Sequence, residues 1–260
     1  MIRKLILVLF ILLSCASLAN AGGIISFPGG GVPSGVDYSY IILWINAEGA
    51  ISGTYNIDGS ECANDTTGTI NGELTIDAVT PLVGAGSFVT AGTYDHVLFS
   101  MATTAMPEGR IGIMVDPISE PIDNGVIFDL RHSANNDRII LRYDGTDDVQ
   151  FIIIENDIQI ATLSTAANNY DTDTLMIEVA WKSDIGDGSD TMEIFADGVS
   201  IVSLSNETLD EALGYDGFYI GNLSAVANTI RMDQIIISND STKSLNALKA
   251  LLSAPVGACP

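Results

Sequence analysis

The sequence predicts an all-β protein in which short antiparallel strands form a sandwich or a barrel. Segments of five to ten residues rich in Ile, Val, Thr, Phe and Tyr recur from Asp37 onward, separated by Gly, Asp and Asn. Several separators have the composition of hairpin turns, and no helices alternate with the strands. The chain has 260 residues, 47% of them hydrophobic, which is enough to bury one large core in a single domain.

The individual strands are predicted from apolar segments bounded by turn residues. The expected strands are Tyr38–Ala47, Glu73–Asp77, His96–Met101, Arg110–Val115, Gly125–His132, Arg138–Tyr143, Val149–Glu155, Ile158–Leu163, Thr174–Lys182, Thr191–Ala196, Val199–Leu204, Gly217–Gly221 and Thr229–Ser238. Asp144-Gly145 and Asn156-Asp157 are predicted turns. Asp197-Gly198 predicts a two-residue type I′ hairpin, because both positions tolerate a positive φ.

Two stretches have helical patterns. Asn206 to Leu213 is long enough for one or two turns. Ser241 to Leu252 begins with a plausible N-cap and places Leu245, Leu248, Leu251 and Leu252 at helical spacing. We expect a sandwich over residues 37–240, with a short amphipathic helix and a tail over residues 241–260.

The first residues have the composition of a secretory signal peptide. Arg3 and Lys4 form a positive start, Leu5 to Leu13 is apolar throughout, and Ala19-Asn20-Ala21 is a signal-peptidase site. We therefore expect residues 1–21 to be removed and the protein to be secreted or displayed at the cell surface. Leu12 to Cys15 also resembles a bacterial lipobox, so lipidation of Cys15 is the alternative. No later segment has the length of a membrane helix.

Residues 22–36 are rich in Gly and Pro and predict a leader or linker. Without Cys15, Cys62 and Cys259 remain, and two cysteines in an exported protein favour a disulfide that joins the C-terminal tail to an early loop. Two unpaired thiols are the alternative.

The charge balance limits the partners. Ten Lys and Arg residues stand against 33 Asp and Glu, a formal net charge of -23. Such a chain repels nucleic acid and anionic membrane surfaces. Cations, neutral polymers and basic proteins are the partners that this charge permits.

A series of motifs resembles the concanavalin A-like, laminin-G-like jelly rolls. The segments that carry the resemblance are Gly86–Phe99, Arg110–Val115, Leu175–Lys182, Met192–Gly198, Phe218–Asn222 and Ile230–Ser238. Their order and spacing agree with that family over roughly Ser39 to Asn239. The resemblance implies two curved antiparallel sheets packed face to face. It leaves function open, because lectins, adhesion modules and hydrolases share this fold.

The sequence lacks the hydrolase signature of that fold, which is a set of carboxylates at alternate positions of one strand. It also lacks the Gln-x-His of the related polysaccharide lyases. Both histidines, His96 and His132, are interpreted as structural. Trp44 and Trp181 lie in apolar strands, so we expect both in the core rather than in a sugar site.

A polar sheet face is therefore the predicted ligand surface, provided that strand register brings its members together. Its candidate residues are Asp129, Arg131, Arg142, Glu178 and Glu193. A solvated face with cross-strand ion pairs is the alternative interpretation.

Calcium is the one cofactor that the acidic loops suggest. Asp184, Asp187 and Asp190 recur every third position around glycines, and calcium prefers carboxylate and carbonyl oxygens. A second cluster contains Asp144, Asp147 and Asp148. The alternative is turn chemistry, because Asp and Gly are common in hairpin loops for conformational reasons alone.

Three functional hypotheses follow. The first is a secreted, non-catalytic module that binds a glycan or an extracellular protein surface, with or without calcium. The second is a structural subunit of an extracellular layer or filament, which would assemble with further copies of itself. The third is a polysaccharide hydrolase or lyase whose site the sequence does not reveal.

Overall fold

Strands β1 to β15 and a single 3-10 turn make up the regular structure of the described residues. The structure is a computed structural model, and it describes residues 37–45, 68–118, 125–134, 136–144, 149–165, 174–183, 190–207, 214–225 and 227–249. The chain divides into two units, Met1–Gly35 and Val36–Pro260, and every described residue belongs to the second. The predicted signal peptide and leader, both cysteines of the predicted disulfide, Asp184 and Asp187 lie outside the described residues.

The strand bounds agree with most of the predicted segments. They are β1 Ile41–Ile45, β2 Gly68–Asn71, β3 Thr75–Asp77, β4 Ser87–Val89, β5 His96–Ala105, β6 Glu108–Pro117, β7 Gly125–Arg131, β8 Arg138–Tyr143, β9 Val149–Glu155, β10 Ile158–Ser164, β11 Leu175–Lys182, β12 Asp190–Ala196, β13 Val199–Glu207, β14 Gly214–Gly221 and β15 Ile230–Ser238. The strand prediction omitted β2, and it omitted β4 although the family resemblance covers that segment. The predicted helix at Asn206 to Leu213 is wrong at its start, because Asn206 and Glu207 end β13.

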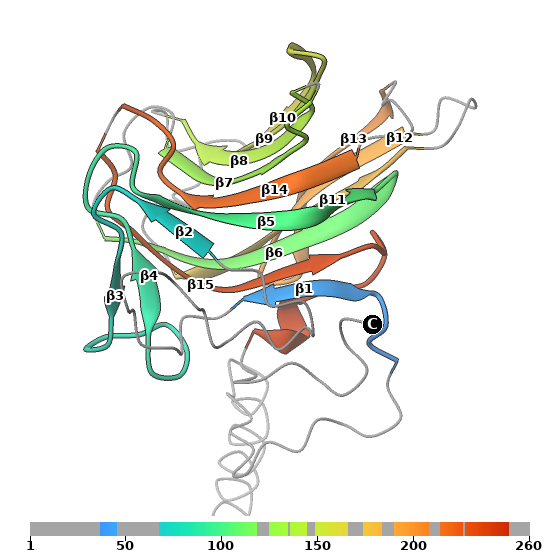
Figure 1. Cartoon of the computed structure of the whole chain (residues 1–260). Coiled ribbons are helices and arrows are strands. Elements are labelled where there is room, and N and C mark those ends of the chain that lie inside the picture. The colour runs from blue at the N-terminus through green and yellow to red at the C-terminus, as the bar shows by residue number, and fades with distance from the viewer. Residues whose placement is uncertain are drawn as a thin grey trace, which may run out of the picture. The chain divides into compact units, whose positions relative to one another are not determined.

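The strands form two antiparallel sheets. In the described part of the chain, the eight-stranded sheet has the order β13-β12-β11-β6-β15-β4-β3, and β1 also pairs with β15. The seven-stranded sheet has the order β10-β9-β8-β7-β14-β5-β2. The two sheets form separate layers (Figure 1), which confirms the predicted all-β sandwich.

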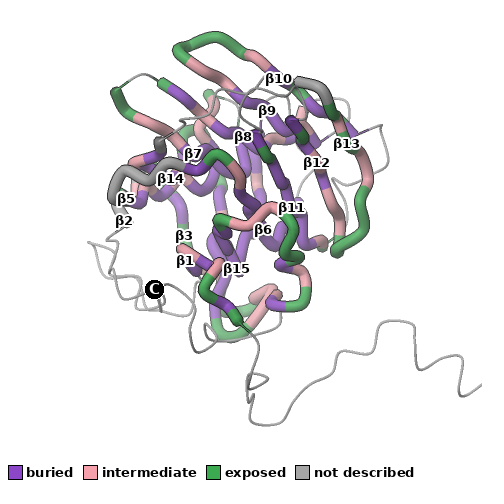
Figure 2. Tube along the Cα trace, turned by 90° about the vertical axis from the view of Figure 1, so that its right-hand side faces the viewer, coloured by how far each residue is buried: buried purple, intermediate pink, exposed green. Residues whose placement is uncertain are grey.

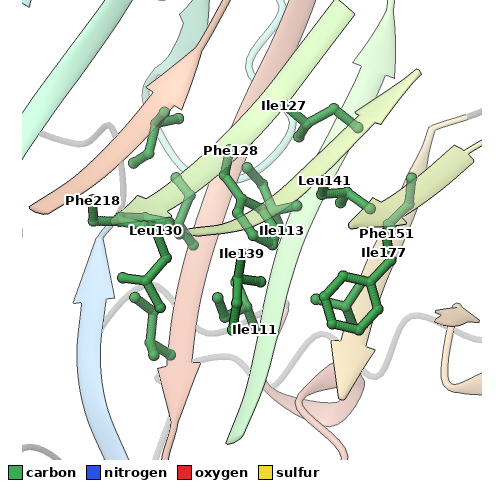
Figure 3. Close-up of a cluster of buried hydrophobic side chains, with 14 of the residues drawn as sticks. Ile111, Ile113, Ile127, Phe128, Leu130, Ile139, Leu141, Phe151, Ile177 and Phe218 are labelled. Carbon is green, nitrogen blue, oxygen red and sulfur yellow. The ribbon is translucent and has the colours of Figure 1, made fainter. Parts of the chain in front are cut away.

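The hydrophobic core lies between the layers. Alternate residues of each strand point inward, as on β8, where Ile139, Leu141 and Tyr143 are fully buried. Figure 3 shows such side chains meeting from β6 and β11 on one sheet and from β7, β8, β9 and β14 on the other. Buried residues follow the strands, and exposed residues are frequent in the connections (Figure 2).

Both tryptophans are buried, as predicted. Trp181 belongs to the core cluster, and its indole Nε1 donates a hydrogen bond of 3.1 Å to the carbonyl oxygen of Met106. Trp44 lies between two core residues of β1 and therefore points to the opposite face of the eight-stranded sheet, beside its cross-strand partner Ile236.

Two of the predicted hairpin turns are confirmed by their backbone angles, whereas Gly145 of the predicted Asp144-Gly145 turn lies outside the described residues. Asp197 and Gly198 have φ values of 49° and 80°, as a type I′ turn requires. Asn156 and Asp157 have φ values of 48° and 65° between β9 and β10. These short connections make neighbouring strands antiparallel and fix their register.

The C-terminal segment packs on the outer face of the eight-stranded sheet. Leu245 and Leu248 are buried, as the helical pattern suggested, but the described segment forms only a 3-10 turn, Asn246–Leu248. A Cβ placed on Gly112 would lie 2.4 Å from Met176 Cε and 3.2 Å from Leu245 Cβ. A larger residue at this position would require the flexible end of Met176 to move and Leu245 to shift slightly away from the sheet.

A buried ion pair fixes this segment. Arg110 Nε lies 2.7 Å from Glu178 Oε2, and the two side chains are 4% and 0% exposed. The same carboxylate oxygen accepts the backbone N–H of Leu245 at 2.7 Å. The guanidinium also lies 3.7 Å from the ring centroid of Phe195, a cation–π contact.

We expect Glu178→Gln to destabilise the protein by about 3–5 kcal/mol, because it leaves the buried Arg110 charge without its counterion. Glu193→Gln on the neighbouring strand is the control, since Glu193 is half-exposed and its described partner is the Ser200 hydroxyl. Chemical denaturation measures both variants. Equal, small losses would show that the Arg110–Glu178 pair contributes little.

Candidate functional site

The structure divides the predicted ligand-binding residues between the two sheets. Asp129 and Arg131 lie on β7 and Arg142 on β8, all in the seven-stranded sheet. Glu178 and Glu193 lie on β11 and β12, in the eight-stranded sheet. The register therefore does not bring all five together. Alternation along one strand predicts the face of a residue but not the sheet that its strand joins.

Asp129 organises the outer face of the seven-stranded sheet. Its side chain is 0% exposed and lies against two arginines that are 33% and 28% exposed. Arg131 donates to Oδ2 from Nε at 2.9 Å and from Nη2 at 2.7 Å. Arg138 donates from Nε to both carboxylate oxygens, at 3.2 Å and 3.1 Å, and its Nη2 also contacts Oδ2. One buried carboxylate thus holds two guanidinium groups.

Arg138 is not among the predicted ligand-binding residues, although the sequence contains a signal for it. Arg131 ends β7 and Arg138 begins β8, and the two residues are directly opposite each other in the antiparallel pair. A hairpin drawn between these two predicted strands places both side chains on one face.

Tyr219 extends the site onto β14. Strand β14 lies between β7 and β5, and Tyr219 pairs with Asp129. The guanidinium carbon of Arg131 lies 4.4 Å from the centroid of the half-buried Tyr219 ring. On the other side, the His96 ring of β5 lies 5.6 Å from Tyr219, measured between ring centroids. We call Arg138, Asp129, Arg131, Tyr219 and His96 the arginine–tyrosine row.

No local sequence pattern indicates this arrangement. His96 was interpreted as a structural strand residue, and Tyr219 was noted only as part of a strand motif. The two rings meet because β14 inserts between β5 and β7, which are distant from it along the chain.

A buried carboxylate also fixes the β5 end of the row. Asp95 is 1% exposed and accepts backbone N–H groups from Glu73 at 2.7 Å, Ala91 at 3.0 Å and Gly92 at 2.5 Å. Gly221 has a φ of 107°, and a Cβ there would lie 2.6 Å from the Asp95 carbonyl oxygen. These contacts hold the backbone that places His96 beside Tyr219.

Tyr94 lies next to this end of the row and is 53% exposed. Its φ of 59° is uncommon for a bulky residue. Its backbone N–H donates to the Ser224 carbonyl at 3.0 Å, and its own carbonyl lies 2.9 Å from His96 Nδ1. The turn thus presents an aromatic ring to solvent close to the arginine–tyrosine row.

Arg142 lies on the same sheet face, further along β8. Its Nε donates to Gln150 Oε1 at 2.9 Å, and Gln150 Nε2 donates to Asp144 Oδ2 at 2.6 Å. A small apolar cluster of Val126, Ile140 and Ile152 lies beside these polar groups. This face therefore offers hydrogen-bond donors, an aromatic ring and apolar surface together.

The calcium hypothesis stays a prediction. Asp190, the one described member of the predicted calcium loop, begins β12 and is 3% exposed. Within the described ranges, no group of three or more His, Cys, Asp or Glu side chains is arranged to hold a metal ion. Nor does the described part of the chain contain a helix long and apolar enough to cross a membrane.

Comparison with known proteins identifies the fold. No protein-family model and no curated protein sequence matches the chain. Among solved structures it is similar to the botulinum neurotoxin serotype D binding domain, with a TM-score of 0.60 and 10% identity over 82% of this chain and 52% of that chain.

Two further structures show the same similarity. One is the serotype D ligand-binding domain in complex with N-acetylneuraminic acid, with a TM-score of 0.59 and 10% identity over 81% of this chain and 50% of that chain. The other is a structure whose description states that cell entry of botulinum neurotoxin type C depends on interaction with two ganglioside molecules. Its TM-score is 0.58, with 11% identity over 84% of this chain and 52% of that chain. The chain spans about half the length of these domains. At this identity the comparison shows a shared β-sandwich fold.

The environment of His96 gives its protonation a predictable direction. Burial lowers the pKa of His96 below its ordinary value of 6.5, and the nearby Arg131 charge acts in the same direction. Between the lowered pKa and 6.5, the unfolded chain binds a proton that the folded chain does not. Stability therefore rises with pH through this window and is complete above it.

We expect the free energy of unfolding of the wild type to fall more between neutral and mildly acidic pH than that of His96→Gln. Denaturation of both proteins across this range measures the difference. An NMR titration of the His96 ring, assigned from its loss in the variant, checks the cause. A midpoint at or above 6.5 would contradict the assignment of the effect to His96.

Proposed function

We propose that the chain is a non-catalytic β-sandwich module that binds a glycan on the outer face of its seven-stranded sheet. The observation that carries the proposal is the arginine–tyrosine row, in which the half-buried Tyr219 ring lies between Arg131 and His96. We further propose that the module belongs to the concanavalin A-like, laminin-G-like superfamily and acts outside the cell, as its sequence motifs and N-terminal residues suggest.

The chemistry of the row suits a sugar. One face of a sugar ring is lined by C–H groups that can stack on an aromatic ring, and the hydroxyl groups at its rim need hydrogen-bond partners. Tyr219 supplies the ring, and the two arginines supply N–H donors beside it. The buried Asp129 and Asp95 fix these groups in place, which lowers the entropy that binding must remove.

The similar structures support the proposal through their described ligands. One of those domains was solved with N-acetylneuraminic acid, and another study ties its toxin to gangliosides. This chain spans about half of each domain. The proposed binding site is therefore taken from the arginine–tyrosine row of this chain and not from the ligands of those domains. Calcium, if it takes part, is proposed for the loop that contains Asp184, Asp187 and Asp190.

A glycan array followed by calorimetric titration of the retained glycans tests the proposal. We expect Tyr219→Ala to weaken binding at least tenfold, because the stacking platform is lost, without unfolding the sheet. Tyr40→Ala is the matched control, since Tyr40 is also half-buried but precedes β1 of the eight-stranded sheet. Binding that both variants retain would place the ligand elsewhere, and failure to bind any glycan would reject the function.

A second candidate is cleavage of a carboxylated glycan by β-elimination, and the contact of His96 with Tyr219 beside Arg131 favours it. In that reaction a base removes the proton from the carbon next to the carboxylate. The glycosidic C–O bond breaks as a C=C bond forms, and an acid protonates the leaving oxygen. The lowered pKa of His96 keeps its imidazole neutral, as a base requires.

This candidate predicts shortened, unsaturated products when the wild type is incubated with a carboxylated oligosaccharide, and none with His96→Gln. Mass spectrometry of the recovered sugar distinguishes the two functions. Quantitative recovery of intact sugar from the wild type would leave the protein as a binding module.

A further inference from the structure

We propose that the glycan bound by the arginine–tyrosine row is anionic, and that a sugar carboxylate pairs with Arg131 and Arg138. This inference rests on the proposed function and names the class of glycan that the site takes. It follows from the hydrogen-bonding capacity of the two guanidinium groups and from their charge.

The two arginines have donors to spare. Each guanidinium carries five N–H groups. The contacts with Asp129 use Nε and Nη2 of both arginines. Among the described residues, neither Nη1 group has a hydrogen-bond partner. Because about a third of each side chain is exposed, these unused donors are available to a ligand.

The Arg131–Asp129–Arg138 group is positively charged although the whole chain is acidic. Two guanidinium charges face one carboxylate, so the Arg131–Asp129–Arg138 group has an excess of one positive charge. Two carboxylates on neighbouring segments keep their negative charge while they accept hydrogen bonds from neutral donors: Asp216 from Ser133, and Asp144 from Gln150.

The two arginines of the eight-stranded sheet are paired with carboxylates. Arg110 is buried against Glu178, and Arg231 contacts both Asp77 and Asp116. The Arg131–Asp129–Arg138 group, by contrast, combines partly exposed guanidinium donors with an excess of one positive charge.

A carboxylate fits this site better than a phosphate polymer does. The planar fork of a guanidinium matches the two oxygens of a carboxylate, and the single negative charge equals the local excess. A ligand with many charges would meet the field of a chain whose net charge is -23. Neighbouring strands are about 4.8 Å apart, so a sugar whose carboxylate reaches Arg138 on β8 can continue over Tyr219 on β14.

The test compares carboxylated oligosaccharides with their own methyl esters, which keep the hydroxyl groups and lose the charge. The probes are oligogalacturonate, oligomannuronate, hyaluronate oligosaccharides and sialyllactose, each measured by calorimetry in both forms. We expect the wild type to bind at least one acid form tenfold or more tightly than its ester. Arg138→Gln should remove this preference, while Asp129 keeps Arg131 as its partner.

Two variants sharpen the result. Arg138→Lys keeps the charge but loses the fork, so it should retain only part of the preference. Lys182→Gln removes one positive charge from an exposed position of the eight-stranded sheet and should leave the preference unchanged. Thermal unfolding of each variant confirms that it is folded.

The outcomes separate this inference from the proposed function. If neutral glycans or esters bind through Tyr219 as tightly as the acids, the glycan-binding function stands and the anionic class is wrong. If acids bind but Arg138→Gln keeps the full preference, the carboxylate binds elsewhere and the inference is wrong. If no acid, ester or neutral glycan binds at all, the proposed function fails, and the inference fails with it.

Discussion

The burial of carboxylates constrains the whole structure. This acidic chain places several carboxylates inside, and each one needs donors because an unpaired buried charge is very unfavourable. Asp95, Asp129, Glu178 and Asp233 are all 1% exposed or less. Each joins segments that are distant in sequence or opposed across strands: Asp95 binds the backbone at residues 73 and 91–92, Asp129 binds two arginines, Glu178 binds the C-terminal segment, and Asp233 binds Val83 and Ser87. These carboxylates act as cross-links, and two of them hold the candidate site.

The same constraint distributes the few arginines unequally. Arg110 pairs with Glu178 beneath the C-terminal segment, so the chain itself covers the outer face of the eight-stranded sheet at this point. Asp129, by contrast, shares two arginines and neutralises only one charge. An excess charge is thereby left on the sheet face that also carries Tyr219 and His96. Both places use arginine and a buried carboxylate. One arginine pairs with Glu178 in the structural ion pair, whereas two arginines pair with Asp129 in the candidate site.

Local patterns predicted the strands and turns well because both depend on neighbouring residues. Arg138–Tyr143 and Val149–Glu155 are strands with the predicted bounds, and Asp197-Gly198 forms the predicted turn. The candidate site was predicted in part: Asp129 and Arg131 do share a face, whereas Glu178 belongs to the other sheet. Tyr219 and His96 were missed because their meeting depends on β14 lying between β5 and β7, a long-range pairing. Leu245 and Leu248 are buried as their spacing suggested, and in the described residues the segment that carries them forms one 3-10 turn.

The net charge and the local charge act over different distances, and together they define what can reach the site. Surface charges further apart than about 8 Å are largely screened at physiological ionic strength. The overall charge of -23 therefore opposes mainly a polyanion long enough to lie over many surface carboxylates, and it contributes little to the binding of one carboxylate on the sheet. At contact, the two guanidinium groups and the Tyr219 ring dominate, and the carboxylate beneath them has already fixed their positions. A glycan with few charges and an apolar sugar face is weakly repelled by the chain and can contact both the guanidinium groups and the Tyr219 ring. A densely charged polymer could make the contact with the guanidinium groups, but the acidic chain repels it.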